Sequence, residues 1–381
     1  MNVLQVIPQL EAGGAERTTL EVAQAVVAAG GRALVASEGG RLEAELAAIG
    51  GELVRLPVGS KNPWTVWRNV ERIADIVRNE DIDIIHARSR APAWSAKWAA
   101  ERTGAHFITT YHGTYNARTG LKRWYNGVMA QGELVIANSN FIADHVRAQH
   151  PGASDRIRVI PRGVDLDSFD PLKITSQRIV DLAATWGVDW PAERLIALFP
   201  ARLTGWKGQR EMLMALGQLK AEGMPLPLTL FAGDAQGRDG YLAELESLVG
   251  QYELEADVHI VGHCSDMPAA FAMADIALTP SVEPEAFGRT AAEAGAMHVP
   301  VIAADHGGAR EVVLPGQTGW RVEPGKPAAL AAAIREAISM TPAERTEMGE
   351  RAAQYIRTQF STRALQTATL RVYDEVLNST P

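Results

Sequence analysis

The feature that most constrains this chain is a regular alternation between short apolar runs and longer amphipathic segments. The runs lie at residues 2–8, 32–37, 52–58, 81–87, 106–112 and 133–139. Continuous apolar runs of this kind are typical of strands buried on both faces of a sheet. Between them, residues 64–80 place Val66, Val70 and Ile73 at helical spacing. Alternating strands and helices predict an α/β fold with parallel sheets.

The alternation is interrupted once and then starts again. IRVIPRGVDLDSFDP, at 157–171, contains breakers that mark a loop and a domain boundary. A second series of runs follows at 194–201, 226–233, 257–262, 274–281, 299–305 and 319–324. We therefore predict two doubly wound Rossmann-like domains that face a cleft, with boundaries at 1–165 and 166–355. Residues 342–377 read as helix throughout, and we expect 356–381 to pack back on the N-terminal domain.

Composition and charge exclude several classes of protein. A formal charge of -8 argues against a general nucleic-acid binder, because polyphosphate binding needs a basic surface. The single cysteine, Cys264, excludes an internal disulfide and is expected to be a buried structural thiol. The N-terminus does not resemble a signal peptide, and no apolar run is long enough to span a membrane. We expect a cytoplasmic protein, with peripheral contact at the inner face of the membrane as a further option.

Loops that directly follow strands are the places to look for ligand-binding residues in such a fold. Gly13 and Gly14 follow the first run, at a turn that opens a helix and could approach an anion through its N–H groups. A plain strand-to-helix turn would also explain this pair. Arg202 and Lys207 follow the first run of the second series, before a glycine-opened helix. Two cations in that position suit a diphosphate.

Two further loops are less informative. Gly233 and Asp234 follow the next run, where they could meet a ligand or form an ordinary turn. Asp165 and Asp167 form an Asp-x-Asp triplet, but they lie in the segment between the two series. We expect no metal site there, and no His, Cys or Asp cluster elsewhere has metal-ligand spacing.

The stretch SVEPEAFGRTAAEAG places two carboxylates, Glu285 and Glu293, with seven residues between them. Glu285 falls in the loop after a strand, and Glu293 falls more than one turn into the following helix. The two can grip separate ends of one ligand rather than act as an adjacent acid and base. Backbone N–H groups at the helix start would face the same ligand; they belong to Ala286, Phe287 and Gly288.

EAFGRTAAE resembles the E-x7-E motif of the family 4 glycosyltransferases, which are retaining enzymes of the GT-B fold. The likeness covers nearly the whole chain, in order and spacing. It is carried by GGAER, YHG, IANS, PRGVDLDSF, ARLTGWKG, VGHCSDMPAAFAMADIALTPS, AADHGGAREVV and TGW.

The resemblance implies donor-binding roles at the matching positions. Arg202 and Lys207 would bind the donor diphosphate, helped by the backbone near Gly14. Glu293 would hold the ribose hydroxyls. The segment from Gly262 to Met267 would flank the nucleobase.

The resemblance also implies which residues lie near the reacting sugar. Glu285 would face the donor sugar, with the N–H groups of Phe287 and Gly288 on its hydroxyls. Glu283 lies two positions earlier and could compete for that role. His112, in YHG, would lie near the reacting sugar and the acceptor. The catalytic set expected is therefore His112, Arg202, Lys207 and Glu285.

The acceptor side is less legible in the sequence. His86, Arg88 and Arg90 lie at the end of a strand of the N-terminal domain, facing the cleft, and would suit an anionic acceptor. Segments 60–69 and 116–129 mix tryptophan and tyrosine with arginine and lysine, which suits an anionic membrane surface. Ordinary amphipathic helices with a solvated face would give the same pattern.

The first interpretation is a metal-independent retaining glycosyltransferase without a cofactor, acting on a cell-envelope glycolipid or saccharide. Its donor would be a nucleoside-diphosphate sugar, with UDP or GDP as the favoured carrier. Attack from the side on which the diphosphate leaves would need no protein nucleophile. A nucleotide-sugar epimerase of the same fold, or a non-catalytic nucleotide-sugar-binding protein, are the alternatives.

Overall fold

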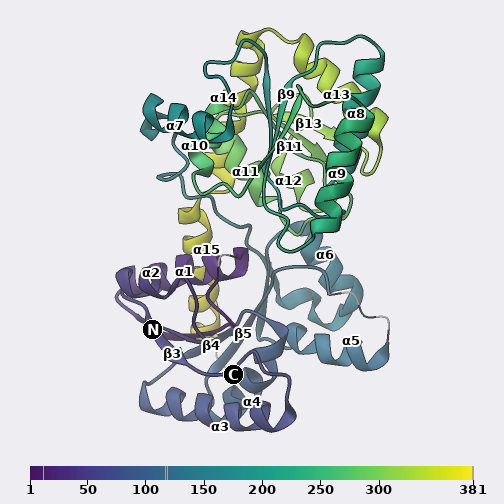
Figure 1. Cartoon of the computed structure of the whole chain (residues 1–381). Helices are drawn as coiled ribbons and strands as arrows, with labels where there is room; N and C mark the ends of the chain where they lie inside the picture. Colours follow the sequence, from purple (N-terminus) through teal and green to yellow (C-terminus); the bar gives the residue numbers. More distant parts are fainter. Residues whose placement is uncertain (12, 116, 118, 380–381) are drawn as a thin grey trace. The chain divides into compact units, whose positions relative to one another are not determined.

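The computed structural model describes residues 1–11, 13–115, 117 and 119–379, and the chain forms two compact units. Unit 1 comprises Met1–Gly163 and Thr362–Pro381, and unit 2 comprises Val164–Ser361. The chain therefore leaves unit 1 once and returns to it once (Figure 1). The predicted boundary at 165 lies two residues from the first crossing. The predicted boundary at 355 falls inside a helix of unit 2, six residues before the second crossing.

Unit 1 is built on a seven-stranded sheet in the order β3-β2-β1-β4-β5-β6-β7. Its paired strands are parallel, as in the register Val3↔Ala33 and Val3↔Ile84. The strands are β1 (Asn2–Val6), β2 (Arg32–Ser37), β3 (Glu52–Arg55), β4 (Ile84–Ala87), β5 (His106–Tyr111), β6 (Leu134–Ala137) and β7 (Ile157–Val159).

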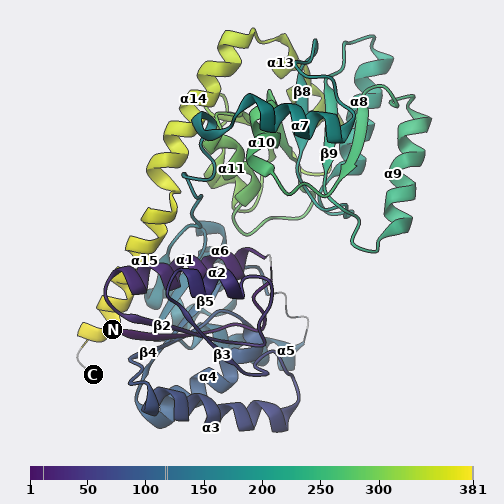
Figure 2. The same ribbon diagram turned by 60° about the vertical axis from the view of Figure 1, so that its left-hand side comes forward.

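Helices cover both faces of this sheet. The helices are α1 (Gly14–Ala28), α2 (Glu43–Ala48), α3 (Pro63–Asn79), α4 (Arg90–Thr103), α5 (Gly120–Gly127), α6 (Asn140–Gln149) and α15 (Thr362–Asn378). Helices α1 and α15 lie together on one face, and α3 and α4 lie on the other (Figures 1 and 2). Leu20 and Val26 of α1 and Val372 of α15 belong to one buried cluster with the sheet. One of the two helices on this face of the sheet, α15, thus comes from a segment that follows unit 2 in the sequence.

Helix α3 shows how the local sequence sets an element. The Asn62 side chain accepts a hydrogen bond from the N–H of Trp64 at 2.9 Å, and Pro63 occupies the first turn. Val70, Ile73 and Val77 are buried at helical spacing. The predicted helix at 64–80 is confirmed, with its bounds shifted by one residue.

Unit 2 is built on a six-stranded sheet in the order β10-β9-β8-β11-β12-β13, with parallel pairs throughout. The strands are β8 (Ile196–Phe199), β9 (Leu228–Ala232), β10 (Val258–Gly262), β11 (Ile276–Thr279), β12 (Val301–Ala304) and β13 (Gly319–Val322). The helices are α7 (Ser176–Trp186), α8 (Gln209–Ala221), α9 (Asp239–Gln251), α10 (Met267–Met273), α11 (Arg289–Ala296), α12 (Ala309–Val312), α13 (Pro327–Ser339) and α14 (Pro342–Gln359).

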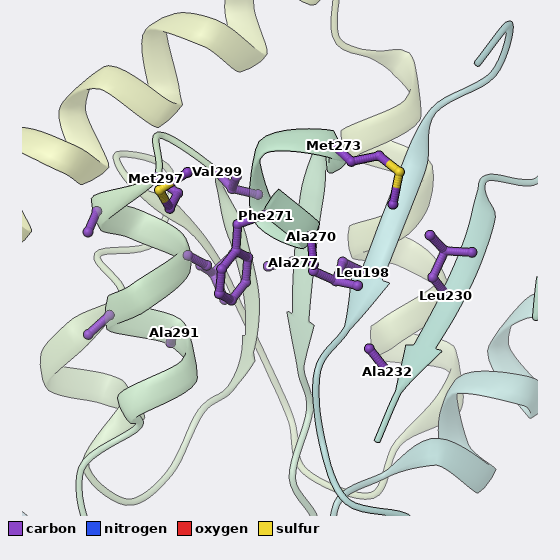
Figure 3. Close-up of a cluster of buried hydrophobic side chains, with 14 of the residues drawn as sticks. Leu198, Leu230, Ala232, Ala270, Phe271, Met273, Ala277, Ala291, Met297 and Val299 are labelled. Atoms are coloured by element: carbon purple, nitrogen blue, oxygen red, sulfur yellow. The ribbon is translucent and has the colours of Figure 1, made fainter. Parts of the chain in front are cut away.

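The strands of unit 2 divide their side chains between two buried clusters. Leu198 packs with α10 and α11, whereas its neighbour Phe199 packs with α8 and α13 on the other face. Figure 3 shows Phe271 of α10 in the first cluster, between Ala277 of β11 and Ala291 of α11. Burial on both faces explains the continuous apolar runs in the sequence. The predicted fold class, two Rossmann-like α/β domains, is confirmed.

The prediction of continuous helix over 342–377 is wrong. Helix α14 ends at Gln359, and α15 begins at Thr362. Between them, the carbonyl of Phe360 accepts a hydrogen bond from the N–H of Val164 at 2.7 Å, and Ser361 forms a β-bridge with Val164. The buried Phe360 ring packs against Phe287, with ring centroids 5.5 Å apart. These tertiary contacts outweigh the helical pattern, because they pair backbone groups that a continued helix would use itself.

Candidate functional site

The first candidate site lies where the strand order of unit 2 reverses. Strands β8 and β11 are neighbours, yet the chain runs from β8 to β9 on one side and from β11 to β12 on the other. In open parallel sheets, ligands bind beyond the carboxyl ends of the strands at such a point. The loops to consider are therefore residues 200–208 after β8 and residues 280–288 after β11.

These two loops fit against each other closely. The N–H of Val282 donates to the carbonyl of Trp206 at 2.7 Å. Gly208 has a φ of +93°, and a Cβ there would lie 2.3 Å from the carbonyl oxygen of Pro280. Only glycine suits that combination of backbone angle and contact. The loops after β8 and β11 thus hold each other in place at the carboxyl edge of the sheet.

Lys207 and Glu285 meet on that edge. The Nζ atom of Lys207 lies 2.7 Å from Oε1 of Glu285, and the hydroxyl of Ser281 donates to the same oxygen at 2.5 Å. Both charged side chains are mostly buried. Nε2 of His306 donates to the carbonyl of Ser281 at 2.8 Å. Ser281 and His306 were not expected; the signal that could have found them is their position in loops directly after β11 and β12.

A third loop holds the backbone of Glu285. Gly307 has a φ of +61°, and a Cβ there would lie 2.5 Å from the carbonyl oxygen of Glu285. The N–H of Gly308 donates to that oxygen at 2.8 Å. Glu283, the competing candidate, is exposed. Its N–H lies 3.4 Å from the carbonyl of Trp206, a longer contact than those that hold Glu285.

Glu293 has a different partner from Glu285. It lies in the second turn of α11, where Nε of Arg289 donates to its Oε1 at 2.8 Å. Burial raises the pKa of the Glu293 carboxyl, although the charge of Arg289 acts against that shift. Gly288 precedes α11 with a φ of +98°. Phe287 is buried, so its ring anchors the start of the helix.

Arg202 lies apart from the Lys207–Glu285 pair. Its side chain is exposed, and Nη1 lies 3.4 Å from Oε1 of Gln236. The loop after β9 packs against the backbone just before Arg202: a Cβ at Gly233 would lie 2.0 Å from the carbonyl oxygen of Ala201. The N–H of Leu203 donates to the carbonyl of Asp234 at 3.0 Å. Arg202 is therefore a solvent-facing cation at the carboxyl edge of the sheet.

The segment expected to flank a nucleobase, Gly262 to Met267, follows β10 at the carboxyl edge of the unit 2 sheet. Gly262 ends β10 with a φ of +75°. Asp266 caps α10 through Ala269 and receives two hydrogen bonds from Arg178, at 3.0 and 2.7 Å. Met267 packs on the buried cluster of Figure 3. A nucleobase contact by this segment stays a prediction.

A second candidate site lies in unit 1, beyond β5 and β1. Nη2 of Arg162 lies 3.4 Å from Nδ1 of His112, and a Cβ at Gly14 would lie 1.7 Å from Nη1 of Arg162. Because a guanidinium can only donate, the ring proton of His112 belongs on Nε2, which is buried without a partner among the described residues. Arg162 was not expected; it follows β7, as His112 follows β5.

The electrostatics of this second site favour an anion. Burial lowers the pKa of His112 well below its ordinary value, and the charges of Arg162 and Arg88 act in the same direction. His112 is therefore neutral near pH 7. The guanidinium of Arg162 lies against the N-terminus of α1, which carries partial positive charge itself. The charge of Arg162 and the partial charge of the helix N-terminus together suit a phosphate or carboxylate.

The structure does not support direct acceptor contact by His86 and Arg88. His86 is 0% exposed, with its ring nitrogens 2.7 Å from the hydroxyls of Tyr373 and Thr110. Arg88 is also buried and donates to Gln5 at 2.8 Å. Both side chains bind the sheet to its covering helices. Sequence reading missed this because it could not show that α15 covers the strand.

Arg90 is half-buried and remains a candidate. Nη1 donates to the side-chain oxygen of Asn126 at 3.0 Å, and the guanidinium lies 4.3 Å from the ring centroid of Tyr115. Its contact with an acceptor stays a prediction.

The described residues show no group of three or more His, Cys, Asp or Glu side chains that could hold a metal ion. Asp165 instead caps a turn by accepting from the N–H groups of Asp167 and Ser168 at 3.0 and 3.3 Å. Cys264 is buried, and burial raises its thiol pKa to about 11. Within the described ranges, no helix is both long and apolar enough to cross a bilayer.

Comparisons with known proteins agree with the fold. Residues 185–355 match the family described as glycosyl transferases group 1, and residues 12–168 match the family described as glycosyltransferase family 4. A solved glycosyltransferase from Rickettsia africae is 35% identical, with a TM-score of 0.92 over 100% of this chain and 99% of that one.

Two other matches are more distant. The HepE protein of Anabaena, solved in complex with UDP, has a TM-score of 0.84 and 23% identity, covering 98% of this chain and 100% of its own. A D-inositol 3-phosphate glycosyltransferase from Xylanimonas cellulosilytica is 32% identical over 206 residues. That match covers 54% of this chain and 48% of the relative, so the chain spans about half of that relative's length.

Proposed function

The chain belongs to family 4 of the glycosyltransferases and has their GT-B fold, and we propose that it is a retaining enzyme acting on a cell-envelope acceptor. Its donor would be a nucleoside-diphosphate sugar and its acceptor a glycolipid or saccharide. The observation that carries the proposal is the Lys207–Glu285 pair at the reversal of the strand order, with Glu293 in the helix that follows.

Each part of the donor has a chemically suited partner in unit 2. Lys207 and Arg202 offer positive charge to a diphosphate. Glu293 offers carboxylate oxygens to the ribose hydroxyls, and Glu285 does the same for the sugar. UDP is the first candidate carrier, because a protein of similar fold is solved with UDP.

The proposed transfer needs no protein nucleophile. The acceptor oxygen bonds to the anomeric carbon as the bond from that carbon to the diphosphate oxygen breaks. The acceptor proton passes to an oxygen of the leaving phosphate, on the same face of the sugar. Protein groups then contribute position and charge: Lys207 and Arg202 stabilise the leaving diphosphate. In its neutral form, His112 can donate from Nε2 to a sugar hydroxyl.

A thermal-shift screen tests the donor site. Purified protein is heated with UDP, GDP, ADP and CDP sugars in turn. We expect one nucleotide to raise the melting temperature, and Arg202→Ala to abolish that shift. Arg210→Ala is the control, because Arg210 lies on the following helix and pairs with Glu244. No shift with any nucleotide sugar would contradict the donor site as assigned.

Product analysis separates transfer from the alternatives. With the donor so identified, labelled sugar is followed into lipid-extractable and polysaccharide fractions of cell envelopes. An epimerase would change the donor without any acceptor, and a binding protein would leave it intact. We expect transfer with retained anomeric configuration. We also expect chelator to leave the rate unchanged; a loss restored by a divalent cation would contradict the metal-independent mechanism.

A further inference from the structure

Unit 1 carries a group of exposed aromatic rings that its own fold does not use. Trp64 and Trp67, at the start of α3, are 64% and 48% exposed and stack with ring centroids 5.3 Å apart. Leu121 and Trp124 on α5 are 76% and 59% exposed. Together with Trp98 of α4, these residues are called the tryptophan surface below.

The tryptophan surface spans three helices that pack on one another, with ring contacts between α4 and α5. Trp94 of α4 lies beneath it, with its ring centroid 4.4 Å from that of Trp124 and 5.2 Å from that of Trp98. Nε1 of Trp94 donates to the carbonyl of Tyr125 at 3.2 Å. On its other side, α4 contacts α3 through the hydroxyl of Ser95, which donates to the carbonyl of Val66 at 3.0 Å. Helices α3, α4 and α5, labelled in Figure 1, therefore hold these rings in place.

An ordinary amphipathic helix does not account for the exposed rings. The buried face of α3 is already made by Val70, Ile73 and Val77. Trp64 and Trp67 lie outside that face, as their exposure shows. Large apolar side chains gathered on a surface mark an interaction site more often than singly scattered ones do.

Charge indicates the kind of partner. Although the whole chain has a charge of -8, unit 1 has 21 Lys and Arg against 18 Asp and Glu, and unit 2 has 16 against 27. Residues 53–70 and 102–132, which include the exposed ends of α3 and α5, contain no Asp or Glu. Lys61, Arg68, Lys122 and Arg123 are exposed there. Residues 116 and 118, in the same basic-aromatic segment, lie outside the described residues.

A groove of about 540 Å³ borders Trp124. Arg123, His150 and Arg156 line it, and no Asp or Glu is among the described residues of its lining. The guanidinium of Arg156 donates to the carbonyls of Gly132 at 2.6 Å and Gly152 at 3.3 Å, so it is held at the groove wall. Cations around an open groove beside an aromatic ring suit a phosphate ester at an apolar boundary.

We propose that the tryptophan surface and this groove dock unit 1 on a bilayer of anionic phospholipid. The indole rings enter the boundary between head groups and acyl chains, and Lys122, Arg123 and Arg156 face lipid phosphates. A bilayer fits better than a protein partner, because the exposed rings of α3 and α5 lie beside cations in two sequence segments, 53–70 and 102–132, that contain no Asp or Glu. The proposal concerns residues outside the donor site and stands whichever sugar is transferred.

Vesicle flotation of the full chain tests the proposal. One set of vesicles contains phosphatidylcholine alone, and the other contains phosphatidylcholine and phosphatidylglycerol in equal parts. We expect binding to the anionic set only, and lower binding at high salt. Lys122→Glu with Arg123→Glu should weaken that binding about thirtyfold or more, since each cation near a membrane contributes about a fivefold effect. Trp64→Ala with Trp67→Ala should also weaken it.

Matched controls make the test decisive. Arg363→Glu with Arg371→Glu makes the same charge change on α15, on the opposite face of the unit 1 sheet, and should leave binding unchanged. Equal loss in both charge variants, or no flotation of the parent protein, would overturn the proposal. So would displacement of the protein from vesicles by glycerol phosphate, which would assign the groove to a soluble anion. Each variant should keep the nucleotide-sugar thermal shift, so a failed donor site would be seen separately.

Discussion

Nζ of Lys207 lies 2.7 Å from Oε1 of Glu285, although the two residues are 78 positions apart in the chain. The proposed function assigns Lys207 to the donor diphosphate and Glu285 to the donor sugar. In this ion pair, each side chain neutralises the charge of the other. Under the proposed function, the two members of this ion pair would contact two ends of one ligand, so the position of one side chain would depend on the other.

Lys207→Ala should lower kcat more than it weakens donor binding, because its charge acts mainly on the departing diphosphate. Removing one preorganised donor of this kind costs roughly a hundredfold in kcat. Steady-state transfer kinetics and nucleotide titration give the two quantities. Arg210→Ala is the control. A loss of affinity with unchanged kcat would show that Lys207 binds the ground state and the transition state equally.

Gly307→Ala should impair catalysis through Glu285. A side chain at Gly307 strains a left-handed backbone by roughly 1–2 kcal/mol and also clashes with the carbonyl of Glu285. Gly316→Ala is a matched control, since Gly316 has a φ of +72° and no atom of the described residues lies within 4 Å of its Cβ position. Both variants should lose stability in urea unfolding, but only Gly307→Ala should also lose kcat. Equal kcat in the two variants would argue against support of Glu285 by this loop.

As the pH is lowered, donor binding should begin to weaken at a higher pH than it would if Glu293 were an exposed glutamate. Burial raises the pKa of Glu293, so protonation removes the ribose acceptor while exposed carboxylates are still ionised. The folded state binds this proton more tightly than the unfolded state does, so the free energy of unfolding should rise as pH falls through the same range. Glu293→Gln should weaken nucleotide binding roughly tenfold or more and flatten its pH dependence. Calorimetric titration across pH measures both effects, and an unchanged profile would remove Glu293 from the ribose.

Tyr373→Phe should destabilise unit 1 by roughly 1–3 kcal/mol, because it leaves a buried ring nitrogen of His86 without its partner. Thr110→Val removes the partner of the other ring nitrogen. Since both act through one imidazole, the two effects should be non-additive in a double-mutant cycle of urea unfolding. Strict additivity would mean that His86 does not couple strand and helix.

The sequence was most informative where strands end. Strands buried on both faces leave continuous apolar runs, and so the positions of Lys207, Glu285 and His112 just beyond them could be read directly. The pairing of Lys207 with Glu285 could not be read in this way, because it depends on β8 pairing with β11, three strands later in the sequence, as well as with β9. The same limit applies to Arg162, which reaches Gly14 and His112 only through the order of strands in unit 1.

Residues far apart in sequence were the main source of error. His86 and Arg88 lie at the end of β4, where binding residues are expected, but α15 brings Tyr373 over His86 from 287 positions away. The break between α14 and α15 has a similar origin, since Val164 pairs there with Phe360. Helical periodicity carries no information about either contact, because each joins two residues that lie far apart in the sequence.

The return of the chain to unit 1 has a consequence for biosynthesis. Unit 2 is one continuous stretch, Val164–Ser361, whereas unit 1 needs Thr362–Asn378 to cover its sheet. During translation, the strands of unit 1 leave the ribosome first but wait for all of unit 2 before Tyr373 can reach His86. The unit that begins synthesis first is thus the last to be completed, and the part of its sheet that α15 covers stays open throughout that interval.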